Sequence, residues 1–238
     1  MKLCFTINGV PVEARFDDGS VQNVLRPLVE EILRAAESAQ GRFLVLLAAP
    51  PAAGKSTLAA FLEHLSGGRI QALGMDGFHR HQEEILRSTV IRNGESIPMV
   101  RVKGAPESFD ADKLHRTLTA LKRGEPLRFP VYDRTKHDFA EDVQEVTGNV
   151  LLIEGNWLLL DEPVWRDLPR DYTIFIEAEE LLLKSRVIDR RLKTGRTIEQ
   201  AHTLYDECDG PNIRLCMKNH IQPDVLLAMT GDGKYEKR

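Results

Sequence analysis

The residues best suited to chemistry stand close together in the segment LLAAPPAAGKSTLAAFL, residues 46–62. Gly54, Lys55 and Ser56 match the last three positions of the phosphate-binding template G-x-x-x-x-G-K-[ST]. In such a loop, backbone N–H groups and the lysine bind nucleotide phosphates, and the hydroxyl binds Mg²⁺. The alternative is a chance match between an apolar strand and a helix. The expected nucleotide-binding residues are Pro51, Ala52, Ala53, Gly54, Lys55, Ser56 and Thr57.

Two alanines make this loop unusual. Ala49 replaces the first glycine of the template, and Ala52 stands where such loops often carry another glycine. Alanine keeps the backbone N–H and loses only easy access to positive φ. We therefore expect negative φ at both alanines and a loop that still binds a nucleotide.

Two carboxylates follow segments that read as buried strands. Asp76 ends RIQALGMD, and Glu154 stands near the end of LLIEG. Ligands of open α/β sheets bind beyond the carboxyl ends of the strands, so Asp76 should face the same crevice as Lys55. Asp76 can then accept the proton of a substrate hydroxyl or hold the Mg²⁺ shell, and Glu154 can bind Mg²⁺ or position water. A turn-forming aspartate before Gly77 and an acidic strand end without function are the alternatives.

Arginines gather in the segment KSRVIDRRLKTGR. Arg186 and Arg190 are four residues apart and share one helix face, so their guanidinium groups point in one direction. Phosphoryl transfer needs cationic donors, which a mobile lid can bring to the reacting group. A solvated basic face, paired in part with Asp189, Glu179 and Glu180, is the alternative that this run favours when it is taken alone.

Hydrogen-bonding side chains are dense in the segment FPVYDRTKHDF. It carries Tyr132, Asp133, Arg134 and His137 within a few residues. Such a cluster suits a small polar substrate.

Hydrophobic patterns predict strands and helices that alternate around these motifs. Strands are expected at residues 42–49, 69–76, 148–155, 170–178 and 223–229, and helices at 56–65, 110–124, 179–195 and 197–209. Apolar strands that alternate with helices predict an α/β fold with a mostly parallel central sheet.

The chain divides into three expected parts. Residues 1–41 alternate around Asn8-Gly9 and continue into a helical pattern, which predicts a hairpin-helix appendage. The nucleotide-binding domain is expected over residues 42–230 and a flexible tail over 231–238. An edge strand of the hairpin could dock on the core sheet or pair two subunits of a homodimer.

The composition excludes several classes of protein. The 238 residues are 42% hydrophobic and 29% charged, and the net charge of −4 gives no global affinity for nucleic acid or membranes. The longest apolar run is far too short to span a bilayer. The three cysteines, Cys4, Cys208 and Cys216, are too scattered for a disulfide framework or a zinc site. We expect reduced thiols and a cytoplasmic location.

Together the motifs resemble the phosphoribulokinase/uridine kinase family of P-loop kinases, which includes bacterial pantothenate kinases. The matching segments run in the family's order across roughly residues 43–228. They are GKST (54–57), MDGFH (75–79), KGAPESFD (103–110), PVYDRTKHD (130–138), IEGNWLLL (153–160) and the arginine helix near 186–196. They look most similar to a branch often described as fructose-transport or nucleoside kinase-like. The resemblance implies a three-layer P-loop NTPase fold that uses ATP and Mg²⁺.

The resemblance also implies roles for individual residues. Asp76 matches the catalytic base, Lys55 and Ser56 the phosphate and metal residues, and Arg186 and Arg190 the lid arginines. Tyr132 and His137 match residues that approach the nucleoside base in uridine kinases. The other expected site residues are His79 and Arg134 for the substrate, Arg191 for ATP and Glu154 for the metal.

One departure from the family pattern concerns the acceptor. Arg134 replaces an expected phenylalanine, and Phe139 replaces a following arginine. An arginine where a nucleoside base would stack favours a smaller or anionic, oxygen-rich acceptor over uridine.

We therefore expect an ATP-dependent kinase that phosphorylates a hydroxyl of a small metabolite, a sugar or sugar-like compound. A nucleoside or pantothenate kinase is the alternative within enzymes. A nucleotide-dependent switch or chaperone is the alternative of another class. Asp76 and the cluster at 130–138 favour an enzyme, because a switch needs no acceptor pocket.

Overall fold

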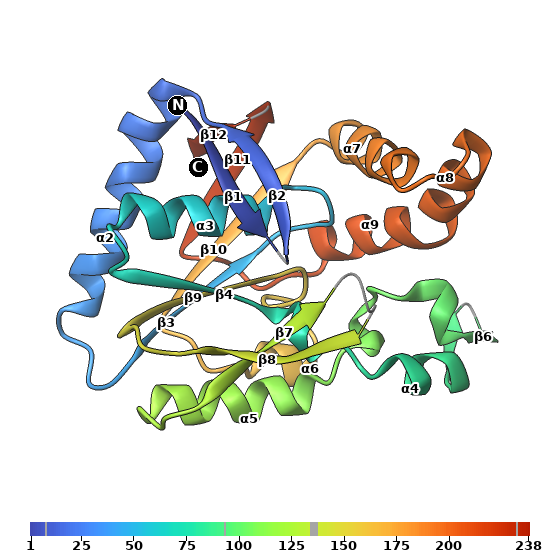
Figure 1. The fold of residues 1–238 in the computed structure, drawn as a ribbon, viewed down its shortest axis with the longest axis horizontal. Coiled ribbons are helices and arrows are strands. Elements are labelled where there is room, and N and C mark those ends of the chain that lie inside the picture. Colours follow the sequence, from blue (N-terminus) through green and yellow to red (C-terminus); the bar gives the residue numbers. More distant parts are fainter. Residues whose placement is uncertain (8, 93, 134–137, 232) are drawn as a thin grey trace.

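The computed structural model describes residues 1–238 except 8, 93, 134–137 and 232 (Figure 1). Its centre is a six-stranded sheet in the order β12-β11-β10-β3-β9-β4, parallel throughout except between β11 and β12. The strands are β3 (Phe43–Ala48), β4 (Ile70–Gly74), β9 (Val150–Gly155), β10 (Tyr172–Ala178), β11 (Val225–Gly231) and β12 (Lys234–Lys237). The expected α/β fold with a mostly parallel sheet is confirmed.

Helices cover both faces of this sheet, which explains why its central strand β3 is apolar throughout. In β3, Val45 and Leu47 belong to one hydrophobic core, while Leu44 and Leu46 belong to another on the opposite face. The helices are α1 (Asp18–Ser20), α2 (Arg26–Ala36), α3 (Lys55–Leu65), α4 (Gln82–Arg87), α5 (Ala111–Lys122), α6 (Pro163–Arg166), α7 (Glu180–Lys193), α8 (Ile198–Leu204) and α9 (Gly210–Lys218). α2, α3 and α7 cover the first core, and α5 and α6 cover the second.

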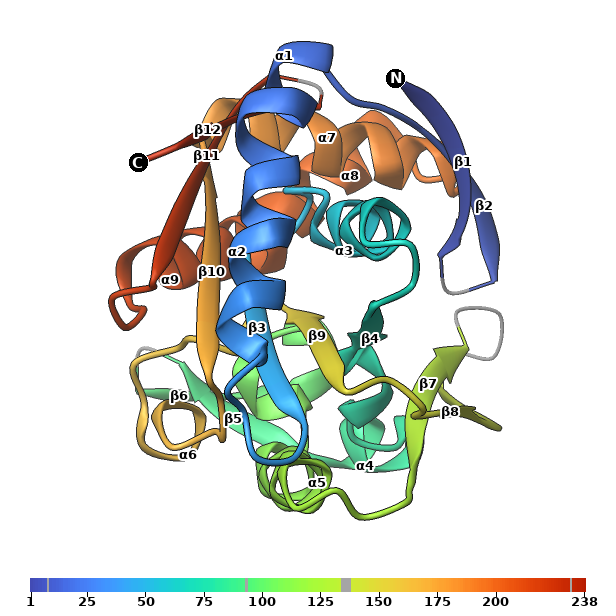
Figure 2. The same ribbon diagram turned by 90° about the vertical axis from the view of Figure 1, so that its left-hand side faces the viewer.

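The N-terminal segment forms the expected hairpin, from β1 (Lys2–Ile7) and β2 (Val10–Arg15). The hairpin is a two-stranded sheet of its own, and Figure 2 shows it on the outer side of α3, away from the central sheet. Phe16 stacks on Phe61 of α3 with the ring centroids 3.7 Å apart. Residues 1–41 therefore share the main core and do not hang from it as an appendage.

The C-terminal residues form a strand where we expected a flexible tail. β12 pairs antiparallel with β11, and Tyr235 is buried. The backbone at Gly233 lies so close to the N-terminal segment that a Cβ on this glycine would be 1.9 Å from the carbonyl oxygen of Arg15. Tyr235 also donates its backbone N–H to Ser20 Oγ at 3.0 Å. The expectation of a frayed end is wrong because these contacts with distant residues hold the segment.

Two further hairpins lie on the side of the second core, and the sequence patterns did not indicate them. They are β5 (Thr89–Arg92) with β6 (Glu95–Pro98), and β7 (Arg128–Asp133) with β8 (Asp138–Glu145). Both are short antiparallel pairs outside the central sheet. No helix in the described ranges is long and apolar enough to cross a bilayer.

Candidate active site

The phosphate-binding motif lies between β3 and α3, the strand–loop–helix context that the template requires. Gly54 precedes α3 with a φ of 76°. Ala52 has a φ of 67° and is the only non-glycine residue with positive φ among the described residues. Our expectation of negative φ is therefore wrong at Ala52 and holds at Ala49. The loop keeps a left-handed turn at a position that often carries glycine, and alanine there costs roughly 1–2 kcal/mol.

A hydroxyl and a carboxylate meet at the start of α3. Ser56 Oγ donates a hydrogen bond to Glu154 Oε1 at 2.7 Å, and Glu154 is only 7% exposed at the end of β9. Both are hard oxygen ligands of the kind that Mg²⁺ prefers. The described residues contain no group of three or more acidic, histidine or cysteine side chains that could hold a metal alone. This pair still fits Mg²⁺, which usually takes one or two protein oxygens and completes its shell with water and phosphates.

Asp76 lies in the 3₁₀ turn Met75–Phe78, directly after β4. Its carbonyl oxygen is 2.9 Å from His79 Nδ1, which fixes the histidine beside it. The His79 ring lies 3.9 Å from the Phe109 ring and 5.0 Å from the Tyr132 ring, measured between centroids. The turn thus brings a carboxylate next to a small group of aromatic rings.

Gly77 explains how Tyr132 reaches this place. A Cβ on Gly77 would lie 2.1 Å from the carbonyl oxygen of Pro130 in β7, so any side chain would push β7 away. The φ of Gly77 is not positive, so backbone conformation does not require glycine here. Glycine is required because the two backbones lie so close together.

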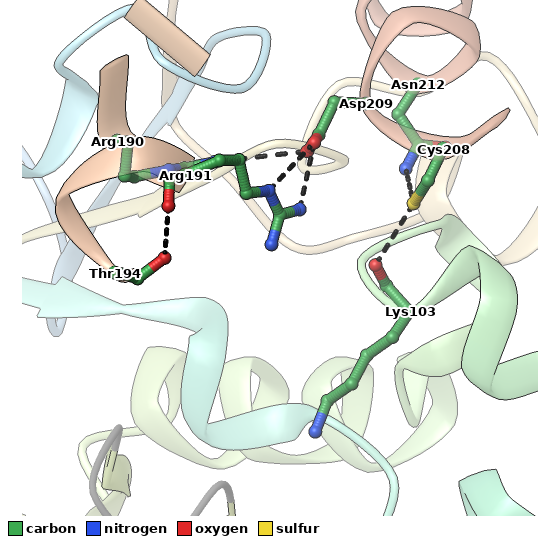
Figure 3. Close-up of polar contacts among 7 residues, drawn as sticks. All are labelled: Lys103, Arg190, Arg191, Thr194, Cys208, Asp209 and Asn212. Atoms are coloured by element: carbon green, nitrogen blue, oxygen red, sulfur yellow. Dashed lines mark hydrogen bonds and ion pairs between the residues drawn. The ribbon is translucent and has the colours of Figure 1, made fainter. Parts of the chain in front are cut away.

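The three arginines of α7 have different surroundings. Arg186 donates a hydrogen bond to the carbonyl oxygen of Ala52 at 3.2 Å, so its side chain contacts the phosphate-binding loop. Arg191 donates to Asp209 Oδ2 from Nη2 at 2.8 Å and from Nε at 3.2 Å, and Arg190 lies 3.9 Å from the other oxygen (Figure 3). The Asp209 side chain is only 9% exposed. A buried carboxylate therefore holds two guanidinium groups in place.

Asp209 was not among the acids that we expected to pair with this run. One of those acids, Glu180, binds Arg214 at 2.8 Å instead. Asp209 stands in the helical turn that links α8 to α9, and no local pattern marks it.

Two cavities meet at the phosphate-binding loop. The first, called the Asp76 cavity, has a volume of about 600 Å³, and the second, called the hairpin cavity, about 590 Å³. Ala52, Lys55 and Arg190 line both. Beyond these three, the polar residues of the Asp76 cavity include Asp76, His79, Lys103, Tyr132, Asn156, Arg191, Arg196, Asp209 and Asn212. A phosphate on the loop would therefore border both spaces.

Lys103 and Asn156 also belong to the Asp76 cavity, although our site residues did not include them. Both stand inside quoted motifs, KGAPESFD and IEGNWLLL, which was the available signal. Trp157 donates to the carbonyl oxygen of Gly104 at 2.9 Å and so ties the two segments together. Asn156 Oδ1 is buried and has no hydrogen-bond partner in the described part of the chain. Two expected substrate residues, Arg134 and His137, lie outside the described residues.

Comparison with known proteins gives concordant results. The model of the Phosphoribulokinase / Uridine kinase family matches residues 44–223. The chain is 38% identical to "Uncharacterized protein YggC" of Escherichia coli (strain K12), over 99% of this chain and 98% of that protein. It is 33% identical to "Putative uridine kinase C227.14" of Schizosaccharomyces pombe (strain 972 / ATCC 24843), over 79% of this chain and 83% of that protein.

A solved structure agrees with these relatives. The "putative fructose transport system kinase" from Silicibacter sp. TM1040 superposes with a TM-score of 0.76 at 31% identity, covering 87% of this chain and 98% of that one. The family match spans more than half of the chain and includes the phosphate-binding loop, Asp76 and the arginine helix. The chain therefore belongs to the phosphoribulokinase/uridine kinase family of P-loop kinases, phosphotransferases that act on hydroxyl groups of small molecules.

Proposed function

We propose that this protein transfers the γ-phosphoryl group of ATP to a hydroxyl group of a sugar or sugar-like metabolite. The observation that carries the proposal is the position of Lys55 and Arg190, which line both the hairpin cavity and the Asp76 cavity. A γ-phosphate bound between these two cations is in contact with the space in which Asp76 stands.

The donor side follows from the phosphate-binding loop. Backbone N–H groups at the start of α3 and the Lys55 ammonium bind the phosphates. Ser56 and Glu154 would hold Mg²⁺, and a bound Mg²⁺ neutralises part of the negative charge of the phosphates. The Arg186 guanidinium stays close to the loop through its bond to Ala52.

The acceptor side uses Asp76. Its carboxylate accepts the proton of the attacking hydroxyl, while Lys55 and Arg190 stabilise the charge on the transferring group. Because such transition states are often loose, much of the catalysis comes from orientation of the acceptor. Asp209 contributes by holding Arg190 and Arg191 at the edge of the cavity.

The lining of the Asp76 cavity favours an acceptor that carries an acidic group as well as hydroxyls. Lys103 and Arg196 add positive charge beyond Lys55 and Arg190, while Arg191 is paired with Asp209. A carboxylate or phosphate on the acceptor would balance this charge.

A uridine-type nucleoside is the second candidate acceptor. The rings of His79, Phe109 and Tyr132 offer stacking surfaces for a base, and one relative carries the name of a uridine kinase.

The test is a screen of candidate acceptors with the purified protein, ATP and Mg²⁺. Sugars, sugar acids, sugar phosphates, nucleosides and pantothenate are compared by ADP release, and each product is identified by mass spectrometry. We expect a phosphorylated sugar or sugar-like compound. A phosphorylated nucleoside as the best product would support the second candidate. ADP release that no acceptor stimulates would contradict the proposal.

Two variants test the assigned residues. Lys55→Ala should abolish transfer in a folded protein, because the ammonium no longer binds the phosphates. Asp76→Asn should keep ATP binding and slow transfer by roughly 10²–10⁴-fold, the usual effect of a positioned base. The matched control is Asp112→Asn on the exposed side of α5, which should transfer at the wild-type rate. Wild-type transfer by Asp76→Asn would remove Asp76 from the mechanism.

A further inference from the structure

The hairpin cavity has a wall that the proposed reaction does not use. One side of the cavity is the phosphate-binding loop and the start of α3 as far as Thr57, and another side is α7 with Arg186. The remaining wall consists of four apolar residues at the tip of the N-terminal hairpin: Ile7, Val10, Pro11 and Val12.

The inward face of the hairpin has two halves with different partners. Alternate residues of β1 and β2 point inward, so Leu3, Phe5 and Val12 share this face. Near the base of the hairpin, Leu3 and Phe5 pack on the main core, and the Phe5 ring lies 6.5 Å from the ring of His64 in α3. Ile7 at the tip faces the cavity, and so does Val12, which pairs with Phe5 across the hairpin. The same apolar face thus packs on the core through Leu3 and Phe5 and borders an open space through Val12 and Ile7.

The space continues along β2 into an adjoining cavity of about 400 Å³. The two cavities share Val12, Gly54, Thr57 and Arg186. Arg186 also donates to Met229 Sδ at 3.1 Å, so it links the phosphate-binding loop to the end of β11. A continuous groove therefore leads from the start of α3 along the hairpin.

The direction of a bound nucleotide follows from these positions. Its phosphates lie on the loop, and the transferring end must face the Asp76 cavity. The nucleoside end must then leave the loop on the other side, where the groove under the hairpin begins at Thr57. We infer that the tip of the N-terminal hairpin, through Val12 and Ile7, forms one wall of the binding site for the base of the nucleotide.

The chemistry of the groove suits this occupant. A nucleobase is uncharged and planar, so an apolar wall can cover one of its faces. The guanidinium group of Arg186 is planar and can lie against a ring. The hairpin lies outside the segment that the family model matches, so this wall is a feature of the chain beyond the shared kinase core.

The inference rests on the proposed function, and one binding experiment separates the two. Calorimetry of the 238-residue chain with Mg²⁺ compares ATP with inorganic tripolyphosphate, which offers phosphates and no base. The variant is Val12→Asn, a polar but uncharged change of the wall. The matched control is Thr6→Asn on the exposed outer face of β1.

We expect Val12→Asn to weaken ATP binding by roughly five- to twenty-fold, the scale of losing one apolar contact surface. It should leave tripolyphosphate binding unchanged, and Thr6→Asn should change neither ligand. Unchanged ATP binding by Val12→Asn would overturn the inference while the kinase proposal stands. Equal weakening of both ligands would also overturn it, because Val12 would then act on the loop. If the wild-type protein binds neither ligand, the proposed function fails and this inference fails with it.

Discussion

Replacing Ala52 by glycine tests the conformation of the phosphate-binding loop. With a φ of 67°, Ala52 occupies the left-handed region, which costs alanine roughly 1–2 kcal/mol. Glycine removes this cost, but it also adds about 0.4–1 kcal/mol of conformational entropy to the unfolded chain. We therefore expect Ala52→Gly to leave the free energy of unfolding unchanged or to raise it by up to about 1.6 kcal/mol.

The same substitution at Ala49 should have the opposite effect, which makes it the matched control. Ala49 is fully buried and its φ is not positive. Replacing Ala49 by glycine removes a buried methyl group worth about 0.8 kcal/mol and raises the conformational entropy of the unfolded chain. We therefore expect the free energy of unfolding to fall by about 1.5 kcal/mol. Urea unfolding of both variants measures the difference, which should be about 2 kcal/mol.

The ATP affinity of Ala52→Gly completes this test. Because the loop already has its left-handed turn, glycine gives no further preorganisation, and we expect ATP affinity to stay within about three-fold of the wild-type value. The reasoning is refuted if Ala52→Gly destabilises the protein as much as Ala49→Gly does. A large gain in ATP affinity would mean that the alanine strains the loop during binding.

Three further predictions concern a close backbone contact and the buried cysteines. Gly77→Ala should force β7 away from the Asp76 turn, because the new Cβ would meet the carbonyl oxygen of Pro130. We expect kcat/KM for the acceptor to fall at least ten-fold while the ATP affinity stays unchanged. An unaffected kcat/KM would contradict the close approach. Burial raises the pKa of the Cys208 thiol to about 11 and that of Cys216 to about 12. At pH 8 a thiol-reactive disulfide reagent should therefore modify only Cys4 in the folded protein and all three cysteines after denaturation; rapid modification of more than one thiol in the folded state would refute this. Because the folded protein keeps these two protons above the ordinary thiol pKa of 9.0, stability should fall as the pH rises from 9 toward 12, which urea unfolding at several pH values would measure.

Local patterns predicted much of the fold and several site residues. The apolar run of β3 followed by Gly54 and Lys55 predicted a strand, a phosphate-binding loop and a helix, all of which the structure contains. The carboxyl ends of parallel strands lie at one edge of a sheet, so the positions of Asp76 and Glu154 could be inferred from strand order alone. These features depend on backbone geometry over short distances along the chain, which residue spacing records.

The remaining features depend on contacts between distant parts of the chain. Ser56 bonds to Glu154, 98 residues away, and Arg191 pairs with an aspartate that no motif marks. The left-handed turn at Ala52 and the C-terminal strand both differ from what local propensity favours. The sequence by itself therefore determined a P-loop kinase architecture and the residues on its strand ends. Only the tertiary structure decided which charges meet and what the N-terminal hairpin covers, because packing between distant segments sets those distances.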